Sequence, residues 1–325
     1  QLAGKLKESF FATTIVPLPY HNPIRLAEDA NVLDQLLGGR FILGLSAGRV
    51  GFSPDFENFG LNPKEQRAIF AEKFAALETL WGHDPQSGPI KFDGQFVKGG
   101  VHGRIQPVSY RAPRPLVAIG SNTEATVRKA GVDGNVMFLG PASFEEAKAR
   151  YAAYREGLDE GGWDEAFKAH RLRHSMIHRQ TVVGETDDEA WQVVEERMGF
   201  NPVMRRQGDS RTIRQMYEDG LRAKSGLSDQ ERHNSNVALG WYMAGSPATL
   251  IDQFREHEEA GIEQIHTRFN TGMWNPEGWQ RSFDLFVREV MPKIGAKTFP
   301  ELDASEIQMA VREGPMPQLA GVDMF

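Results

Sequence analysis

The chain has 325 residues, 40% hydrophobic and 25% charged, which is the composition of a globular protein with ample core material. The net charge of −7 and the lack of a strongly basic segment argue against a nucleic-acid partner. No cysteine is present, which excludes disulfides, thiolate metal sites and cysteine nucleophiles.

Targeting signals are not visible either. No apolar run approaches the roughly 20 residues that a membrane span needs, and the first ten residues lack the apolar centre of a signal peptide. We therefore expect a cytoplasmic protein without a membrane partner.

The first elements in chain order are a strand, a helix and a second strand. Residues 9–16 are rich in aromatic and β-branched side chains, which favour a strand. Asn22 and Pro23 are typical of a helix start, and the glycines at 38 and 39 of a helix end. The apolar run 41–45 predicts a strand covered on both faces.

The same alternation continues along the chain. Further strands are predicted at residues 115–119, 135–139, 173–183 and 263–269. Further helices are predicted at residues 62–82, 143–158, 187–197, 246–261 and 278–294, and one begins after Gly120. Residues 83–114 are interpreted as a long loop or small excursion. Residues 199–240 are polar and irregular, with a short helix around 211–224.

Six strands, most of them followed by a helix, indicate an α/β fold. Two architectures remain open on this evidence: a six-stranded α/β sheet, and a (β/α)8 barrel, which needs two more strands. The chain begins on what reads as the end of a helix, so the barrel interpretation expects two βα units before residue 1.

Two local patterns suggest binding sites. Gly120, Ser121, Asn122 and Thr123 follow a strand and open a helix, where backbone N–H groups and hydroxyls suit a phosphate. Ordinary N-capping explains the same residues. Histidines at 170, 174 and 178 recur every four residues, but their segment is predicted to be a strand, so no metal site is expected.

Five stretches in order resemble the bacterial luciferase-like flavin-dependent monooxygenases. The first is FFATTIVPLPYHNPIRLAEDANVLDQLLGGRFILGLSAG, with its leucine-proline loop, LAED and GRF segments. The others are residues 55–81, 114–138, 182–192 and 244–265. The resemblance implies a (β/α)8 TIM barrel that binds FMN, or a deazaflavin in some branches, at the carboxyl ends of its strands.

The resemblance also implies a domain organisation. Residues 1–297 would form one barrel domain, with an insertion or lid at about 199–240, and residues 298–325 a C-terminal tail. The catalytic histidine of the family would lie before Gln1, so it has no counterpart to name here.

Several residues take on cofactor roles by this resemblance. Thr13 and Thr14 end the first strand behind the isoalloxazine, with a non-proline cis peptide at Thr14–Ile15. Ser46 follows the next strand, and Arg49 is a candidate for the flavin phosphate, although a solvated loop arginine explains it equally well. Gly120 to Thr123 become the phosphate loop.

Substrate contacts are expected from other strand ends. Arg268 and Asn270 would face the barrel mouth, and Trp241 would line an apolar pocket, with core packing as the other explanation. His21 is a weak catalytic candidate, since a loop histidine is commonly structural.

The family implies an enzyme that uses reduced FMN and O2, through a peroxyflavin, to oxygenate a small, apolar organic substrate. A flavin reductase would supply the reduced FMN, and the chain would form a homodimer. Two alternatives stay open: a deazaflavin-dependent hydride-transfer oxidoreductase of the same superfamily, and a non-catalytic flavin-binding subunit.

Overall fold

A computed structural model describes residues 3, 5–6, 9–50, 54–198, 206–269 and 276–295. Its centre is a curled parallel sheet in the order β1-β3-β6-β7-β8-β10, in which β2 also pairs with β3 and β9 with β8. The strands of this sheet are β1 (Phe11–Ala12), β2 (Val16–Pro17), β3 (Phe41–Ser46), β6 (Leu116–Gly120), β7 (Val136–Leu139), β8 (Met176–Val183), β9 (Tyr242–Gly245) and β10 (Gln264–Arg268). This is the α/β fold of a partial (β/α) barrel, as the sequence predicts.

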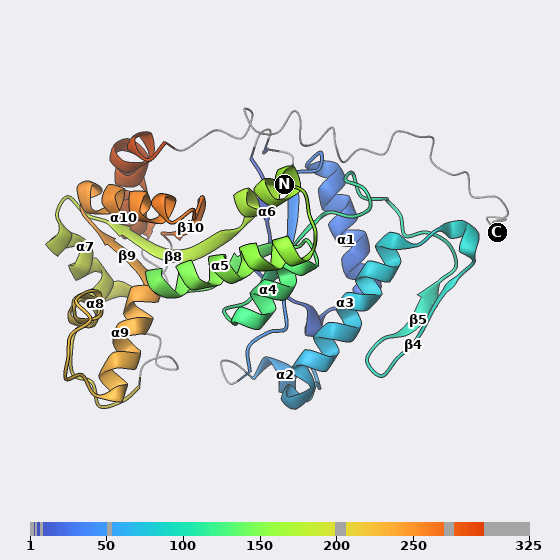
Figure 1. Cartoon of the computed structure of the whole chain (residues 1–325), viewed down its shortest axis with the longest axis horizontal. Coiled ribbons are helices and arrows are strands. Elements are labelled where there is room, and N and C mark those ends of the chain that lie inside the picture. Colours follow the sequence, from blue (N-terminus) through green and yellow to red (C-terminus); the bar gives the residue numbers. More distant parts are fainter. Residues whose placement is uncertain are drawn as a thin grey trace.

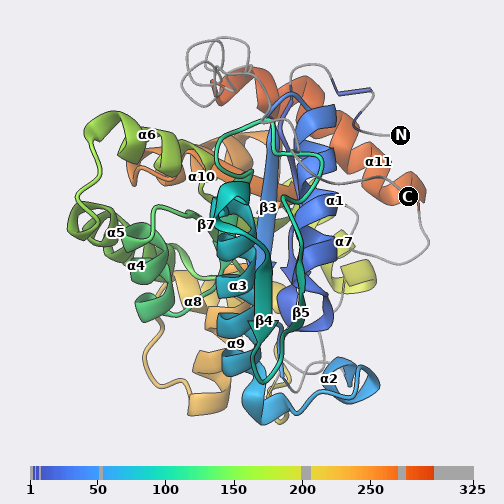
Figure 2. The same cartoon turned by 90° about the vertical axis from the view of Figure 1, so that its right-hand side faces the viewer.

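Helices follow the strands and cover the outer side of the sheet. They are α1 (Pro23–Leu36), α2 (Asp55–Asn58), α3 (Gln66–Gly82), α4 (Glu124–Val132), α5 (Phe144–Glu160), α6 (Glu165–His174), α7 (Asp187–Val193), α8 (Ile213–Leu221), α9 (Asp229–Trp241), α10 (Pro247–Glu259) and α11 (Pro276–Leu285). Figure 1 shows α1 beside α3, α4 beside α5 and α8 beside α9. Figure 2 shows β3 running through the middle of the molecule.

The two faces of the sheet carry two separate apolar clusters. Odd-numbered residues of β3, such as Phe41 and Leu43, pack outward with residues of α1, α3 and α5 in the largest cluster. The even-numbered residues Ile42, Ala118 and Phe138 form a second cluster on the inner face. The period-two alternation of the strands thus separates a helix-covered core from the interior of the curled sheet.

Predicted caps hold the helix starts. The Asn22 side chain accepts a hydrogen bond from the Ile24 N–H at 2.9 Å, with Pro23 at the first helical position. Ser143 and Glu146 form the expected capping box of α5. Each such cap satisfies an N–H group that the helix itself leaves without a partner.

Two predicted strands are wrong in detail. The strand at 9–16 is split into β1 and β2, with residues 13–15 between them. The predicted strand at 173–183 begins only at Met176, since α6 carries His170 and His174. This helix has few apolar residues, so its helical period is weak, and an Asp164 cap marks its start.

The two segments predicted to be mostly loop contain further elements. Within residues 83–114 lies a hairpin of β4 (Ile90–Asp93) and β5 (Lys98–Val101), which reaches away from the body at one end of Figure 1. The short helix predicted around 211–224 is α8, whereas the longer α9 at the end of the same segment was not predicted. Strand β9, which directly follows α9, was not predicted, because four residues are too few to show a period.

Some predictions lie outside the described residues, among them Asn270 and the tail 298–325. The domain boundaries and the lid at about 199–240 stay predictions. None of the described helices is long and apolar enough to cross a lipid bilayer.

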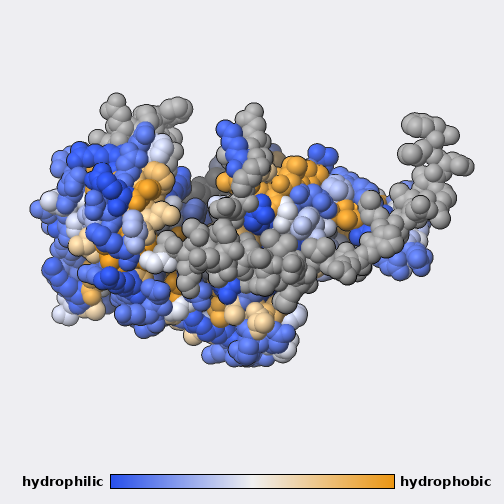
Figure 3. Space-filling view, turned by 90° about the horizontal axis from the view of Figure 1, so that it is seen from above, coloured by the Kyte–Doolittle hydropathy of each residue, from blue (hydrophilic) through white to orange (hydrophobic). Residues whose placement is uncertain are grey.

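Apolar side chains also reach the surface at several places, two of which lie near the edges of the sheet. Val32 and Leu36 are exposed on α1, and Phe283 and Val287 are exposed on α11 and the turn after it. The view from above shows separate apolar patches on a mainly hydrophilic surface (Figure 3). The helices that carry these residues follow β2 and β10, close to the two edges of the sheet.

Candidate functional site

Two glycines, Gly44 and Gly120, interrupt the row of side chains on the inner face of β3 and β6. A Cβ atom on Gly44 would collide with the Thr13 carbonyl oxygen, and one on Gly120 would collide with the side chain of Ile15. The segment between β1 and β2 therefore lies directly on these two strands. Only glycine permits so close an approach of the chain.

The predicted residues Thr13 and Thr14 lie in this segment. The Thr13 hydroxyl accepts a hydrogen bond from the Gly44 N–H at 2.9 Å, which fixes the segment to β3. The Thr14–Ile15 peptide is cis, as the family resemblance implies. Thr14 itself is exposed, whereas Ile15 joins the apolar cluster of the inner face.

The loop between β6 and α4 carries the predicted phosphate-binding residues. The hydroxyls of Ser121 and Thr123 lie 3.2 Å apart, and Ser121 Oγ accepts from the Thr123 N–H. Thr123 is the N-cap residue of α4, but its side chain does not cap the helix. The first N–H groups of α4 have no acceptor within their own helix, so they suit an anion.

Asn122 plays a different part in this loop. Its side-chain amide donates to the Pro141 carbonyl at 2.9 Å and so ties the loop to the segment after β7. This bond occupies one of its polar groups, and its role toward a cofactor stays a prediction.

Arg150 of α5 was missed by the sequence analysis. Its Nε donates to the Asn122 carbonyl at 2.8 Å, and its guanidinium pairs with Glu124 at 3.2 Å. A cation therefore stands beside the predicted phosphate loop. Arg150 reaches this loop because α5 packs against α4. No spacing pattern in the sequence predicts that contact.

Ser46, Arg49 and His21 lie at the same carboxyl edge of the sheet. Ser46 ends β3, and its hydroxyl accepts from the Gly48 N–H at 3.2 Å. Arg49 is exposed in the following loop. His21 is exposed beside α3, and partial burial and the nearby Lys73 lower its pKa. None of these contacts tests a role in binding, so all three assignments stay predictions.

Two histidines face each other on the inner face at the other end of the sheet. His178 of β8 and His266 of β10 are paired in the strand register, and their Nδ1 atoms lie 3.1 Å apart. Burial, followed by the neighbouring His266, lowers the pKa of His178 to about 4. Burial and Arg268 lower the pKa of His266 in the same direction. Both rings are therefore neutral at pH 7.

The register places this pair near the mouth of the curled sheet. Gly120 pairs with Phe138, and Phe138 with Met176, so His178 lies two residues farther toward the carboxyl edge. Two strand residues span about 7 Å. The sequence analysis weighed His178 only as a metal ligand, and the described residues contain no group of three side chains suited to a metal.

Trp241 and Arg268 border the histidine pair. The Trp241 ring meets the His178 ring edge-on, with centroids 6.1 Å apart. Arg268 is the last residue of β10, two residues beyond His266 on the same inner face. Both positions agree with the predicted substrate side, although no contact tests that role. Asn270 lies outside the described residues.

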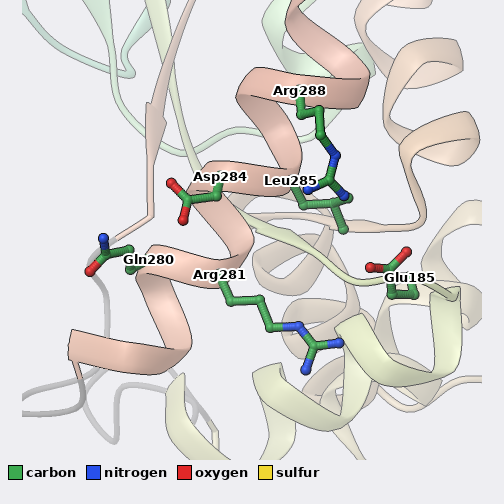
Figure 4. A pocket seen from close by; sticks show the side chains of 6 residues that line it. All are labelled: Glu185, Gln280, Arg281, Asp284, Leu285 and Arg288. Atoms are coloured by element: carbon green, nitrogen blue, oxygen red, sulfur yellow. The ribbon is translucent and has the colours of Figure 1, made fainter.

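A surface pocket of about 380 Å³ opens elsewhere, between α11 and the loop before α7 (Figure 4). It is lined by Glu185, Gln280, Arg281, Asp284, Leu285 and Arg288. Arg281 is already paired with Glu189 at 3.0 Å. The residues that line this pocket carry charges of both signs, and none of them is a predicted site residue. We therefore take the inner face of the sheet as the candidate site.

Comparison with known families decides the assignment. The family described as luciferase-like monooxygenase matches residues 10–264. The chain belongs to this family. The barrel fold of this family explains the order of the strands. It also explains why the candidate site lies toward their carboxyl ends.

Individual luciferase-like relatives differ in how much they share with this chain. The 4-hydroxyprotoasukamycin monooxygenase of Streptomyces nodosus subsp. asukaensis is 40% identical over 315 residues, which covers 90% of this chain and 76% of the relative. The alkanal monooxygenase alpha chain of Photorhabdus laumondii is 26% identical, over 56% of this chain and 48% of its own length. The chain thus matches about half the length of the alkanal monooxygenase alpha chains.

Two solved structures share the luciferase-like fold. The oxygenating constituent of 3,6-diketocamphane monooxygenase from Pseudomonas putida, in complex with FMN, has a TM-score of 0.63 and 21% identity, covering 87% of this chain and 79% of its own. The coenzyme F420-dependent tetrahydromethanopterin reductase of Methanopyrus kandleri has a TM-score of 0.58 and 18% identity, covering 87% and 82%.

Proposed function

We propose that this chain is the oxygenase of a two-component, FMN-dependent monooxygenase that acts on a small organic substrate. The observation that carries the proposal is the glycine surface of β3 and β6 beside the donor-rich start of α4. Gly44 and Gly120 let the segment from Thr13 to Ile15 pack directly on β3 and β6, where this segment would support one face of a planar ring, and the following loop offers donors to an anionic tail.

The residues present fit FMN. Ser121, Thr123 and the first N–H groups of α4 would hold the phosphate, with Arg150 as the nearby cation. Bound reduced flavin supplies the electrons that activate O2, so that one oxygen atom enters the substrate and the other leaves as water. The chain itself would orient the ring and keep water away from it.

Relatives support the finer parts of the proposal. The relative with 40% identity is named as a monooxygenase, and the diketocamphane enzyme with the same fold was solved with FMN. We infer that a separate flavin reductase supplies reduced FMN, that the chain works in the cytoplasm and that it pairs as a homodimer.

A second candidate is an F420-dependent hydride transfer, because an F420-dependent reductase shares the fold. F420 carries a longer anionic tail than FMN. Arg150 lies beside the predicted phosphate loop and is already paired with Glu124, and Arg49 lies in the loop after β3. The predicted phosphate loop offers a short row of hydrogen-bond donors, and the charge of the nearby Arg150 is partly neutralised by Glu124. Such a site suits the shorter anionic tail of FMN better than that of F420.

Titration of the full chain with FMN, riboflavin and F420 tests this proposal. We expect FMN to bind about tenfold more tightly than riboflavin, which corresponds to about 1.4 kcal/mol from the phosphate contacts. The double variant Ser121→Ala, Thr123→Ala should remove this preference, whereas Thr79→Ala on the exposed side of α3 should keep it. Equal binding of FMN and riboflavin, or tighter binding of F420, would contradict the proposal.

A further inference from the structure

Arg150 of α5 holds the predicted phosphate loop at two points. Its Nε donates to the Asn122 carbonyl at 2.8 Å, and its Nη1 lies 3.2 Å from a carboxylate oxygen of Glu124. Glu124 is the first residue of α4 and directly follows Thr123. One guanidinium therefore contacts both the backbone of the loop and the carboxylate at the start of the helix.

Close packing of the two helices fixes the position of Arg150. Helices α4 and α5 lie side by side (Figure 1), and a Cβ atom on Gly131 or Gly157 would collide with a carbonyl oxygen of the facing helix. The Asn122 amide, which donates to the Pro141 carbonyl at 2.9 Å, also ties the loop to the segment after β7. Only 24% of the Arg150 side chain is exposed. Neither the loop nor the guanidinium can therefore shift far without breaking these contacts.

Glu124 places a negative charge where the loop would bind an anion. Among the described residues, no hydrogen-bond acceptor is present for the N–H groups of Glu124, Ala125 and Thr126, which are the first three of α4. These donors and the helix dipole favour an anion at this end of the helix. A carboxylate beside them repels a phosphate unless a cation neutralises its charge.

Arg150 is the cation that neutralises Glu124. The two side chains form an ion pair at 3.2 Å. Arg128, one turn farther along α4, is itself paired with Glu156 and Glu160 of α5. The charges of Arg150 and Glu124 thus offset each other at the loop, and the N–H groups of α4 remain as its donors to a ligand.

Two roles for Arg150 toward a phosphate are chemically possible. A direct role needs a guanidinium donor at the phosphate, whereas in an indirect role the guanidinium acts through Glu124 and Asn122. The Nε and Nη1 groups already serve these two partners, which favours the indirect role. In that role, loss of the cation weakens phosphate binding only while Glu124 keeps its charge.

We propose that Arg150 is a positioning residue of the phosphate loop, which neutralises Glu124 and holds the Asn122 carbonyl so that the first N–H groups of α4 serve the cofactor phosphate. The inference rests on the proposed function, because its ligand is the phosphate of FMN. It assigns Arg150 and Glu124 to one unit, in which the arginine is needed because the glutamate is present.

A double-mutant cycle in the full chain tests this role. The measured quantity is the ratio of the FMN and riboflavin affinities, since riboflavin lacks the phosphate. Arg150→Met should lower this ratio about fivefold, because it leaves the Glu124 carboxylate without its counter-charge. Glu124→Gln should change the ratio by no more than about twofold, and the double variant should return it to within about twofold of the unaltered chain. Riboflavin affinity should stay the same throughout.

The double variant separates the two roles of Arg150. If Arg150 donates directly to the phosphate, the double variant keeps the fivefold loss, and that result would overturn the proposal. Arg150→Gln replaces Arg150→Met in the cycle if the latter does not fold, because glutamine keeps a donor for the Asn122 carbonyl. Lys148→Met is the matched control, since Lys148 also lies on α5 and pairs with a carboxylate, that of Glu145 at 3.7 Å. It should leave the ratio unchanged.

The same measurements keep this inference apart from the proposed function. Equal affinities of the unaltered chain for FMN and riboflavin contradict the proposed function itself. A clear preference for FMN, combined with a fivefold loss that Glu124→Gln does not reverse, contradicts only the positioning role of Arg150.

Discussion

The inner face of the sheet has different chemistry at its two ends. At the β3 and β6 end, Gly44 and Gly120 leave a flat surface on which the segment between β1 and β2 rests. At the β8 and β10 end, the same alternation of side chains places His178 and His266 inward. One end is shaped by close backbone contact, and the other by polar groups held partly away from water.

This difference suggests that the two ends of the curled sheet have different functions. The proposed flavin site lies at the glycine end, where the start of α4 offers donors that suit a phosphate. The histidine end instead presents polar ring atoms on the same inner face. The apolar residues Ala118 and Phe138 lie on the inner face between the two ends.

The largest expected effect is at the glycine end. In Gly44→Ala the new Cβ would collide with the Thr13 carbonyl oxygen and lie 3.0 Å from ring carbons of Phe138. Because one obstacle is backbone held by the Thr13–Gly44 hydrogen bond, we expect a loss of about 3 kcal/mol in unfolding free energy, the upper part of the range for overpacking. Urea unfolding followed by circular dichroism measures this loss.

Gly82→Ala is the matched control for this substitution. Nothing lies within 4 Å of a Cβ at Gly82, so alanine there should leave stability unchanged or raise it by about 0.5 kcal/mol. If Gly44→Ala unfolds at the same urea concentration as Gly82→Ala, the close packing around Gly44 does not require a glycine at this position.

The second prediction concerns pH and the histidine end. His257 of α10 is 5% exposed and lies next to Arg179, and burial followed by this cation lowers its pKa to about 4. Because the folded pKa is below the unfolded value of 6.5, the unfolded chain takes up the proton first as the pH falls. This contribution to stability is complete above about pH 6.5 and is lost down to about pH 4.

Unfolding at pH 7 and pH 5 measures this effect. At pH 5 His257 alone should cost about 2 kcal/mol, at 1.36 kcal/mol for each unit between pH 6.5 and pH 5. His257→Gln should show a weaker pH dependence than the unaltered chain, and His102→Gln should show the same dependence as that chain. A pH dependence that His257→Gln leaves unchanged would mean that His257 is not the titrating group.

The glycine end could be predicted from the sequence much better than the histidine end. The helix start at Asn22, the helix end at Gly38 and the strand at 41–45 all depend on neighbouring residues, which propensity and capping rules describe. The loop at Gly120 follows the same local logic. The family resemblance then added the cis peptide at Thr14–Ile15, which no local rule supplies.

The histidine end depends on contacts between residues far apart in the chain. His178 and His266 are 88 residues apart and meet only because β8 and β10 are neighbours in register. The strand predicted at 173–183 begins three residues before β8. His170, His174 and His178 were therefore considered together as one series, although α6 carries the first two. Arg150 was not predicted for the same reason, because the packing of α5 against α4 brings it to the predicted phosphate loop.

The smallest effect is expected at Arg179. This guanidinium is 1% exposed, and no carboxylate lies within ion-pair distance of it among the described residues. Arg179→Met removes its hydrogen bond to the Gly240 carbonyl but also removes the cost of burying a charge. These two changes oppose each other, so we expect a net loss of only about 1 kcal/mol in unfolding free energy.

A structural role and a positioning role differ in a second measurement. Arg155→Met is the matched control, because Arg155 also donates to a glycine carbonyl, that of Gly261, at 2.8 Å. Both variants should lose similar stability, but only Arg179→Met should shift the ring ¹⁵N signals of His178. If the two variants affect the His178 signals alike, the hydrogen bond from Arg179 to the His178 carbonyl does not act on the histidine pair, and the polar end of the sheet is positioned by its strands alone.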